Sequence, residues 1–445
     1  MFSDFKPLEN ALKAIPISRR YGRVISVDTS TIRIAGLSVH GHVGDQITIS
    51  KTCGAKIAGE IIALEQSYVL AMPYGPSDGI AISDVVELTF TNNVRPSVAW
   101  VGRIIDAFGQ PLDGRPLYSG ETNVPLRRQP PAAASRRSLG ARLNTSLAVL
   151  NTILPIAQGQ RIGIFAGSGV GKSSLLAEMA RGLECDIVVI ALIGERGREL
   201  KEFTEHVLGP EGMQRAIIIT ATSDQSPLVK RRAAWMATAV AEYFRDKGQH
   251  VLLLMDSITR FAEAHREVAL TAGEAPSLRA FPPSTANLIA SFAERAGPGP
   301  EGGGDITAIF TVLVAGSDME EPIADITRGV LDGHVILDRE IAENGRFPAI
   351  DINRSVSRSL PAIASTEENA LISMARKSVS VFEKAAPMVH TGLYAQGSDA
   401  EIDAAIAMQP KLEQFFKRNT PETAVESFAC LDALLNGPTA TRAAE

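Results

Sequence analysis

The stretch that decides the fold runs from Arg161 to Leu183 and reads RIGIFAGSGVGKSSLLAEMARGL. An apolar run is followed by a glycine-bearing loop and then by a run of helical periodicity, which predicts a strand, a loop and a helix. In such a loop the glycines let backbone N–H groups point at phosphate oxygens, the lysine brings charge to the β- and γ-phosphates, and the serine hydroxyl binds Mg²⁺. The loop predicts a nucleoside triphosphate site made by Gly167, Ser168, Gly169, Val170, Gly171, Lys172, Ser173 and Ser174.

One position departs from the usual GxxxxGK[ST] pattern, because Ala166 stands where the first glycine is expected. That position forms a turn and donates nothing to the phosphates, so we expect its methyl group to be tolerated. The alternative is a chance match in a glycine-bearing loop. The strand before the loop and the helix after it argue against that alternative.

Two further apolar runs end in carboxylates that suit the same site. The run HVLLLMD ends at Asp256, and a carboxylate at the end of a parallel strand beside a phosphate loop can hold Mg²⁺ through water. Ser257 follows it, so the base for water attack has to come from elsewhere. We expect Glu195, in the run IALIGERGRE, to orient and polarise the attacking water. The alternative for GERGRE is a solvated loop with local ion pairs.

Composition excludes several classes of protein. The 445 residues, 45% hydrophobic and 21% charged, fit a soluble chain of several domains. Lys and Arg number 44 against 50 Asp and Glu, so a duplex-binding surface over the whole molecule is not expected. Three widely separated cysteines predict neither a disulfide framework nor a zinc site and suit a reducing cytosol. The chain starts without a signal-peptide core, and its longest apolar stretch, Ile306–Ala315, is too short to span a bilayer and predicts a buried strand.

Patterning divides the chain into four ranges, the first being an N-terminal segment, 1–20. In 21–95, short apolar runs between Gly, Asp and Ser breaks predict a closed β domain. Its balanced charge, without a basic and aromatic stripe, favours packing or assembly over single-strand binding. In 96–362, strand-like runs alternate with helical ones, which predicts a parallel sheet, with an exposed connector at 102–146. Residues 363–445 show only helical periodicity.

A family resemblance is carried by the segment from Pro348 to Ser357, PAIDINRSVS, which is followed by Arg358. This segment resembles the signature of rotary ATP synthase head subunits and their relatives. With AGSGVGKS, GERGRE, DSITR and DMEEPIADITRGVLDGHVILDRE, the chain resembles the branch of type III secretion ATPases from about Gly22 to Ile406. The resemblance implies an α/β RecA-like P-loop NTPase core with an N-terminal β-barrel and a C-terminal helical domain.

The resemblance also implies roles for individual residues. Ser173 would bind Mg²⁺, and Phe347 matches a position whose aromatic ring stacks on adenine. Arg358 matches an arginine finger that reaches into the neighbouring subunit's site. Open alternatives are a core aromatic for Phe347 and an ordinary surface arginine for Arg358. The catalytic residues that the resemblance implies are Lys172, Glu195, Arg196, Arg260 and Arg358.

Both halves of such a composite site lie on one chain, so copies of this chain can complete each other's sites in a closed ring. The family implies six subunits. It also implies ATP hydrolysis with Mg²⁺ that energises flagellar type III export, by releasing or unfolding chaperone-bound substrates at a membrane export gate. The implied protein is cytoplasmic, peripheral to the inner-membrane export apparatus, and binds no nucleic acid. Its implied partners are export chaperones, a stator-like regulator and a central stalk protein.

Three other functions stay open. The first is the ATPase of a virulence type III system, the second a hexameric RNA helicase of the termination-factor type, and the third a non-catalytic nucleotide-binding subunit of a rotary ATPase. The intact Lys172 and Glu195 argue against the third. Ala148 and Asn151 stand where relatives usually carry Arg and Asp, so we expect an ion pair to be missing at the junction of the barrel and the core.

Overall fold

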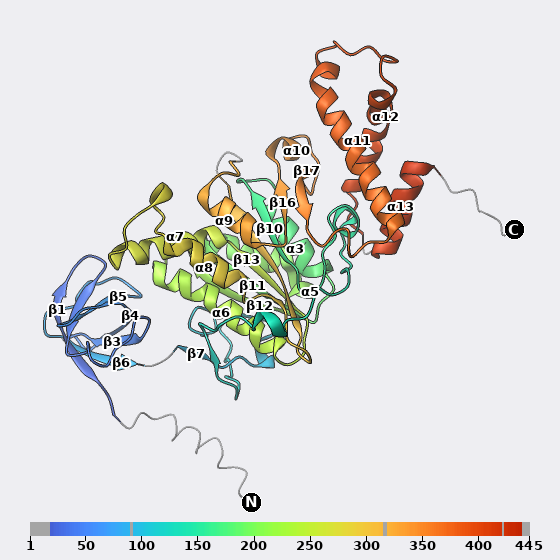
Figure 1. Cartoon of the computed structure of the whole chain (residues 1–445). Coiled ribbons are helices and arrows are strands. Elements are labelled where there is room, and N and C mark those ends of the chain that lie inside the picture. Colours follow the sequence, from blue (N-terminus) through green and yellow to red (C-terminus); the bar gives the residue numbers. More distant parts are fainter. Residues whose placement is uncertain (1–17, 90–91, 315–317, 421, 438–445) are drawn as a thin grey trace, which may run out of the picture.

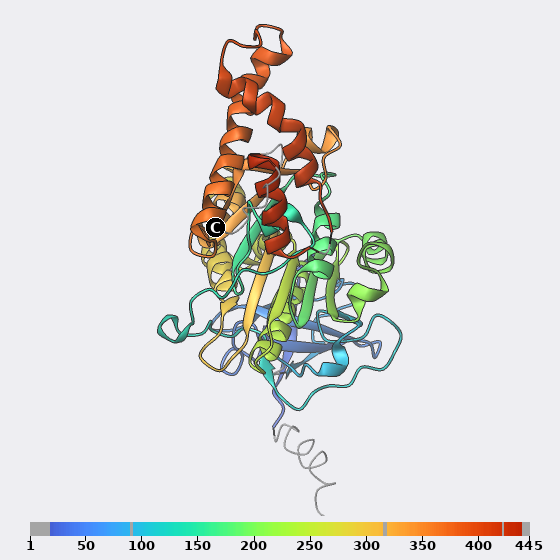
Figure 2. The ribbon, with the colours of Figure 1, turned by 90° about the vertical axis from the view of Figure 1, so that its right-hand side faces the viewer.

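A computed structural model of the chain describes residues 18–89, 92–314, 318–420 and 422–437. The predicted N-terminal segment therefore lies almost wholly outside the described residues, as do Ala315 and the end of the C-terminal range. The described chain forms three bodies in a row: a small barrel at one end, an α/β core in the middle and three helices at the other end (Figures 1 and 2). This confirms the fold class that the resemblance implied.

The barrel is closed by six short antiparallel strands in the order β1-β2-β5-β4-β3-β6. Apolar side chains alternate along them and point inward, which gives the barrel a core of its own, including Val24, Ile34, Ile47, Ile61 and Val69. The predicted closed β domain is confirmed. Its strands are β1 (Tyr21–Val27), β2 (Ile32–Ala35), β3 (Gln46–Ser50), β4 (Lys56–Leu64), β5 (Val69–Pro73) and β6 (Val85–Thr89).

The core is built on one sheet whose main path runs β17-β16-β10-β15-β13-β11-β12-β8. All neighbours on this path are parallel except β16 and β17, which are antiparallel. The apolar stretch that predicted a buried strand is β15. The strands are β8 (Arg103–Asp106), β10 (Arg161–Ala166), β11 (Ile187–Glu195), β12 (Ala216–Thr222), β13 (Val251–Asp256), β14 (Gly297–Pro298), β15 (Asp305–Leu313), β16 (Gly333–Leu337) and β17 (Ile350–Ser357).

Helices cover both faces of this sheet, and successive residues of β11 enter different apolar clusters. One face packs against α6 to α9, and the other against α2, α3 and the C-terminal helices. This burial on both faces explains the continuous apolar runs of the strands. The core helices are α2 (Ala148–Asn151), α3 (Lys172–Gly182), α4 (Gly197–Glu202), α5 (Gly209–Met213), α6 (Pro227–Arg245), α7 (Ile258–Thr271), α8 (Ser284–Ala293), α9 (Pro322–Val330) and α10 (Arg339–Glu343).

The C-terminal body consists of α11 (Thr366–His390), α12 (Ala400–Phe416) and α13 (Ala424–Asn436), as the helical periodicity predicted. Ser365 and Thr423 each form a capping box at the start of α11 and α13. Such boxes satisfy two backbone N–H groups that the first turn leaves free, which fixes where the helices begin. In the described residues, no helix combines the length and the apolar character needed to cross a membrane.

The exposed connector expected at 102–146 is wrong for its first part. Residues 103–106 form β8, which pairs in parallel with β12 at one edge of the sheet. Arg103 is buried and donates to both carboxylate oxygens of Asp113, at 2.5 and 2.7 Å. The glycines, prolines and arginines around β8 hid a four-residue strand, because so short a segment carries little periodicity.

The expectation for Ala148 and Asn151 is also wrong about the place. The two residues lie in α2, which packs on α12 and α13, so they stand at the junction of the core with the C-terminal helices and not with the barrel. Asn151 is fully buried, and its Nδ2 donates to Thr145 O, Glu422 O and Ser427 Oγ, each at 3.0 Å. An amide network therefore joins these two bodies.

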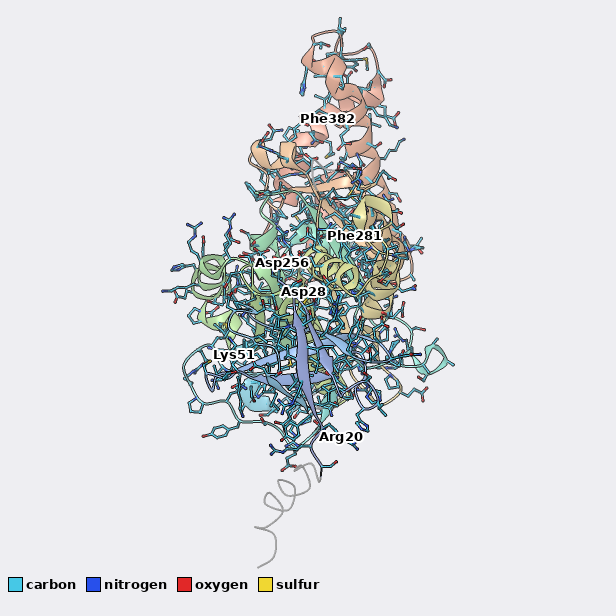
Figure 3. The ribbon with its side chains drawn as sticks, turned by 90° about the vertical axis from the view of Figure 1, so that its left-hand side faces the viewer. Arg20, Asp28, Lys51, Asp256, Phe281 and Phe382 are labelled. Carbon is cyan, nitrogen blue, oxygen red and sulfur yellow. The ribbon has the colours of Figure 1, made fainter. Side chains whose placement is uncertain are left out.

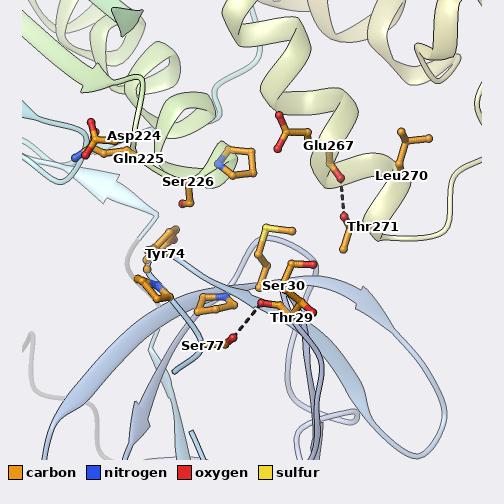
Figure 4. Close-up of a pocket in the computed structure, with 15 residues that line it drawn as sticks. Thr29, Ser30, Tyr74, Ser77, Asp224, Gln225, Ser226, Glu267, Leu270 and Thr271 are labelled. Carbon is orange, nitrogen blue, oxygen red and sulfur yellow. Dashed lines mark hydrogen bonds between the residues drawn. The ribbon is translucent and has the colours of Figure 1, made fainter. Parts of the chain in front are cut away.

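The barrel docks on the core through a buried carboxylate. Glu60 of β4, 3% exposed, accepts from Arg127 at 2.9 Å and from Arg231 of α6 at 3.0 Å. The Arg127 guanidinium lies 4.0 Å from the centre of the Trp235 ring. A cleft of about 710 Å³ beside this contact is lined from both bodies, with Tyr74 on the barrel side (Figure 4). The barrel is thus held to one flank of the core.

Candidate functional site

The predicted phosphate loop lies between β10 and α3, at the end of the sheet that the carboxyl ends of the parallel strands form. Gly169 and Gly171 have φ values of 76° and 85°, in the left-handed region that glycine adopts without strain. The loop opens on a cavity of about 860 Å³. Gly167, Ser168, Gly169, Gly171, Lys172, Ser173 and Ser174 line this cavity, whereas the side chain of Val170 is buried in the core beneath it.

Lys172 and the two predicted carboxylates meet at this edge. Lys172 Nζ donates to Asp256 Oδ1 at 2.5 Å and lies 3.7 Å from Glu195 Oε1. Asp256 and Glu195 come from the ends of β13 and β11, which are adjacent strands, so the sheet itself sets their separation. Figure 3 shows Asp256 in the middle of the molecule, between the barrel and the C-terminal helices. Thr311 of β15, which sequence reasoning missed, donates to Asp256 Oδ1 at 2.8 Å.

The environment of Glu195 gives its carboxyl group the acid–base character of a general base near neutral pH. Burial, then the hydrogen bond to Glu199, and then the charge of Asp256 raise the pKa of Glu195 to about 7, against the lowering effect of Lys172. The same hydrogen bond lowers the pKa of Glu199. Glu199 lies in α4, four residues after Glu195 at the end of β11, and was missed, because no local pattern brings a strand end and the following helix together.

The predicted arginines stand around the mouth of the cavity. Arg196 and Arg260 both line it, and Arg260 Nη1 donates to Glu263, another lining residue, at 2.8 Å. Their side chains are 73% and 44% exposed, so both can move toward a ligand. The structure adds Ser223, Thr259, Glu263 and Glu321 to the cavity wall, residues for which the sequence predicted no role.

Phe347 and Arg358 lie at opposite ends of β17. Phe347 precedes the strand on the side of the phosphate loop, and a Cβ placed on Gly171 would lie 3.1 Å from its ring. Because β17 runs antiparallel to β16, Arg358 follows the end of β17 that lies beside Gly333, the first residue of β16. It is therefore at the end of the sheet opposite to the phosphate loop. A strand of eight residues covers about 25 Å. Arg358 is therefore remote from the cavity of its own chain and does not line it.

These residues fit a nucleotide with its divalent cation. The Ser173 hydroxyl and the Asp256 carboxylate offer the oxygen ligands that Mg²⁺ prefers, beside a lysine placed for phosphate. The exposed face of Phe347, 51% exposed, lies against the loop where a base would lie. The structure thus brings together the predicted loop, carboxylates and arginines, with Arg358 apart; their individual roles stay predictions.

Comparison with known proteins gives the same arrangement of parts. Family models match for the ATP synthase alpha/beta family β-barrel domain at residues 17–89 and for its nucleotide-binding domain at 146–357. The model of the type III secretion EscN ATPase C-terminal domain matches residues 364–432. The flagellum-specific ATP synthase of Caulobacter vibrioides is 42% identical over 424 residues, which are 93% of this chain and 96% of the relative.

Two solved structures are similar over almost the whole chain. Assembled EscN, the ATPase of the enteropathogenic E. coli type III secretion system, has a TM-score of 0.85 at 34% identity and covers 93% of this chain and 100% of its own. EscN in complex with its central stalk EscO has a TM-score of 0.83 at 33% identity, with the same coverage. On this evidence of sequence and structure, the chain belongs to the ATP synthase alpha/beta family, in the branch of the type III secretion and flagellum-specific ATPases.

Proposed function

We propose that this chain hydrolyses ATP in the cavity above its phosphate loop and that the energy drives protein export by a flagellar type III apparatus. The observation that carries the proposal is the meeting of Lys172, Asp256 and Glu195 at one edge of the sheet, beside the glycine-bearing loop. The family and the flagellum-specific relative support export as the use of that energy.

The residues of the chain divide the reaction between them. The backbone N–H groups of the loop and the Lys172 ammonium bind the phosphates, and Lys172 shifts toward them from Asp256. Glu195, as a carboxylate, accepts a hydrogen bond from the attacking water and takes its proton as the water oxygen bonds to the γ-phosphorus; the bond from this phosphorus to the β–γ bridging oxygen breaks, and ADP leaves with that oxygen. Arg196 and Arg260 stabilise the charge that develops on the γ-phosphoryl oxygens. Ser173 and, through water, Asp256 would hold Mg²⁺, which would supply charge that neutralises the β- and γ-phosphates.

Arg358 completes the site of a neighbouring copy. Its position at the edge of the sheet opposite to its own cavity supports this assignment, because a side chain cannot cross the length of β17. A chain that carries the cavity at one place and the finger at another completes its sites by head-to-tail association, which gives a ring when the rotation between copies closes. We assign six subunits to this ring, as the resemblance implies.

The cellular setting follows from the family as part of the same proposal. We place the ring in the cytoplasm, peripheral to the inner-membrane export apparatus, with a central stalk protein and a stator-like regulator. It releases or unfolds chaperone-bound substrates at the export gate. The complex of EscN with its central stalk supports the stalk partner. A virulence secretion ATPase is the second candidate, because assembled EscN comes from such a system.

Deletion of the gene tests the export function. Loss of hook and filament proteins from the culture medium, restored by the parent gene and not by Glu195→Gln, is the expected result. Normal flagellar export with loss of secreted effectors would assign the chain to a virulence system instead. Turnover of the purified protein measured with and without RNA tests the helicase alternative, and stimulation by RNA would favour it.

A further inference from the structure

Arg358, the proposed finger, is hydrogen-bonded to a segment that begins at the nucleotide cavity of its own chain. Glu321 lines the cavity and is the N-cap residue of α9, and the end of α9 leads into β16 (Figure 1). The backbone N–H of Arg358 donates to Asp332 O at 3.0 Å, and its Nη2 donates to Arg328 O at 3.5 Å. The Asp332 carbonyl belongs to the link between α9 and β16, and the Arg328 carbonyl to the last turn of α9.

Asp332 fastens this link to the strand that carries the phosphate loop. Its carboxylate accepts from Arg161 Nε at 2.9 Å, from Arg161 Nη2 at 3.0 Å and from the Arg161 backbone N–H at 3.1 Å. Arg161 is the first residue of β10, whose other end leads into the loop. Gln160 Nε2 donates to Asp332 O at 2.9 Å and to Ser357 Oγ at 3.2 Å, which ties in the residue before the finger.

The hydrogen bonds between Asp332 and Arg161 fix the position of the Asp332 backbone relative to β10. A guanidinium bound to a carboxylate through two parallel hydrogen bonds is rigid and directional. The side chains of Arg161 and Asp332 are only 14% and 27% exposed, so water competes weakly for the pair. Burial lowers the pKa of Arg161, but the pairing with Asp332 and Glu294 raises it by more. The net increase keeps the guanidinium charged.

We propose that Asp332 is a positioning residue for Arg358, which holds the backbone of the finger in register with the phosphate-loop strand of the same chain. The inference rests on the proposed function of Arg358 as a finger acting on a neighbour. It predicts that the loss of the Asp332 carboxylate weakens the site of the next subunit and leaves the chain's own site intact. The ion pair of Asp332 with Arg161 thus connects the phosphate-loop strand of one subunit with the activity of the next subunit.

The first test uses Asp332→Asn in the full chain, which keeps the shape of the residue and removes its charge. We expect kcat to fall at least about tenfold, and by no more than the 10³–10⁵-fold that a lost finger costs, while KM and the affinity for a fluorescent ATP analogue change by less than about twofold. Glu401→Gln is the matched control, because it removes a carboxylate from an exposed pair with Lys377, at 2.7 Å, between α11 and α12. Unchanged kcat in Asp332→Asn overturns the inference.

The second test mixes subunits, so that a finger effect separates from damage to the chain's own site. Asp332→Asn keeps all residues of its own nucleotide site, and Glu195→Gln supplies a correctly positioned Arg358. Mixed oligomers, verified by differently tagged subunits, are expected to regain activity, as are mixtures of Arg358→Ala with Glu195→Gln. Recovery with Arg358→Ala but not with Asp332→Asn overturns this inference alone. Recovery with neither overturns the trans finger itself, and the inference with it.

A third variant covers the case in which Asp332→Asn folds poorly, as judged by its Tm. Arg161→Lys keeps the positive charge but cannot form the two parallel hydrogen bonds. The same fall in kcat and the same recovery on mixing are expected for it. A double variant, Asp332→Asn with Arg358→Ala, is expected to be no slower than Arg358→Ala alone, and a further large fall would show that Asp332 acts on something other than the finger.

Discussion

At the scale of single residues, we expect the reaction to depend on the carboxyl group of Glu195, which lies 3.7 Å from Lys172 Nζ. Glu195→Gln keeps the size of the side chain and removes the base. We expect ATP to bind normally and turnover to fall by about 10²-fold or more, the scale for the loss of a positioned general base. Single-turnover hydrolysis and equilibrium binding of an ATP analogue measure the two effects separately. Near-normal hydrolysis would show that another group takes the proton.

The pH dependence of the reaction follows from the same group. Because burial, Glu199 and Asp256 raise the pKa of Glu195 to about 7, its carboxyl group is largely protonated below that pH and ionised above it. Only the carboxylate can take a proton, so kcat/KM is expected to rise with pH and to reach half its plateau near pH 7. Glu199→Gln removes a group that raises this pKa, so the midpoint is expected to move to lower pH. A midpoint unaffected by Glu199→Gln would contradict this origin.

At the scale of elements, the short helix α2 joins the core to the C-terminal helices through Asn151. Asn151→Ala leaves buried partners in both bodies, Glu422 O and Ser427 Oγ among them, without their hydrogen bonds. We expect a loss of about 1–3 kcal/mol in the free energy of unfolding, measured by urea denaturation, and faster release of the C-terminal helices by protease. Asn436→Ala, on the exposed face of α13, is the control, and an equal effect of both would refute the role of α2.

The strand β17 shows at this scale what the motif PAIDINRSVSR does. Its antiparallel direction places Phe347 beside the phosphate loop and Arg358 at the opposite end of the sheet. If β17 ran parallel to β16, the two residues would exchange ends. Phe347 directly precedes the motif and Arg358 ends it, and the direction of the strand decides at which end of the sheet each residue lies.

At the scale of the whole molecule, the separation of the cavity and the finger predicts that activity depends on assembly. Specific activity is expected to rise with protein concentration as subunits associate, in parallel with the mass measured by light scattering. Arg358→Ala is expected to bind ATP and assemble like the parent, yet to hydrolyse it about 10³–10⁵-fold more slowly. Full activity of a protein that stays monomeric at every concentration would refute the composite site.

Much of this molecule was predictable from its sequence, because local patterns carry local physics. The phosphate loop, the six barrel strands and the helical C-terminal range follow from glycine positions and from apolar periods of two and 3.6 residues. The carboxylates Asp256 and Glu195 were predictable because each ends a buried strand, and parallel strands end at one edge of a sheet.

Only the tertiary structure decided the rest, because those features depend on contacts between segments far apart in the chain. The strand β8 exists through its pairing with β12, Thr311 reaches Asp256 across neighbouring strands, and Asn151 meets α13 rather than the barrel. The pairing of Asp332 with Arg161 joins residues 171 positions apart. No short-range periodicity encodes such contacts; they arise when the sheet order and the packing of its two faces bring the segments together.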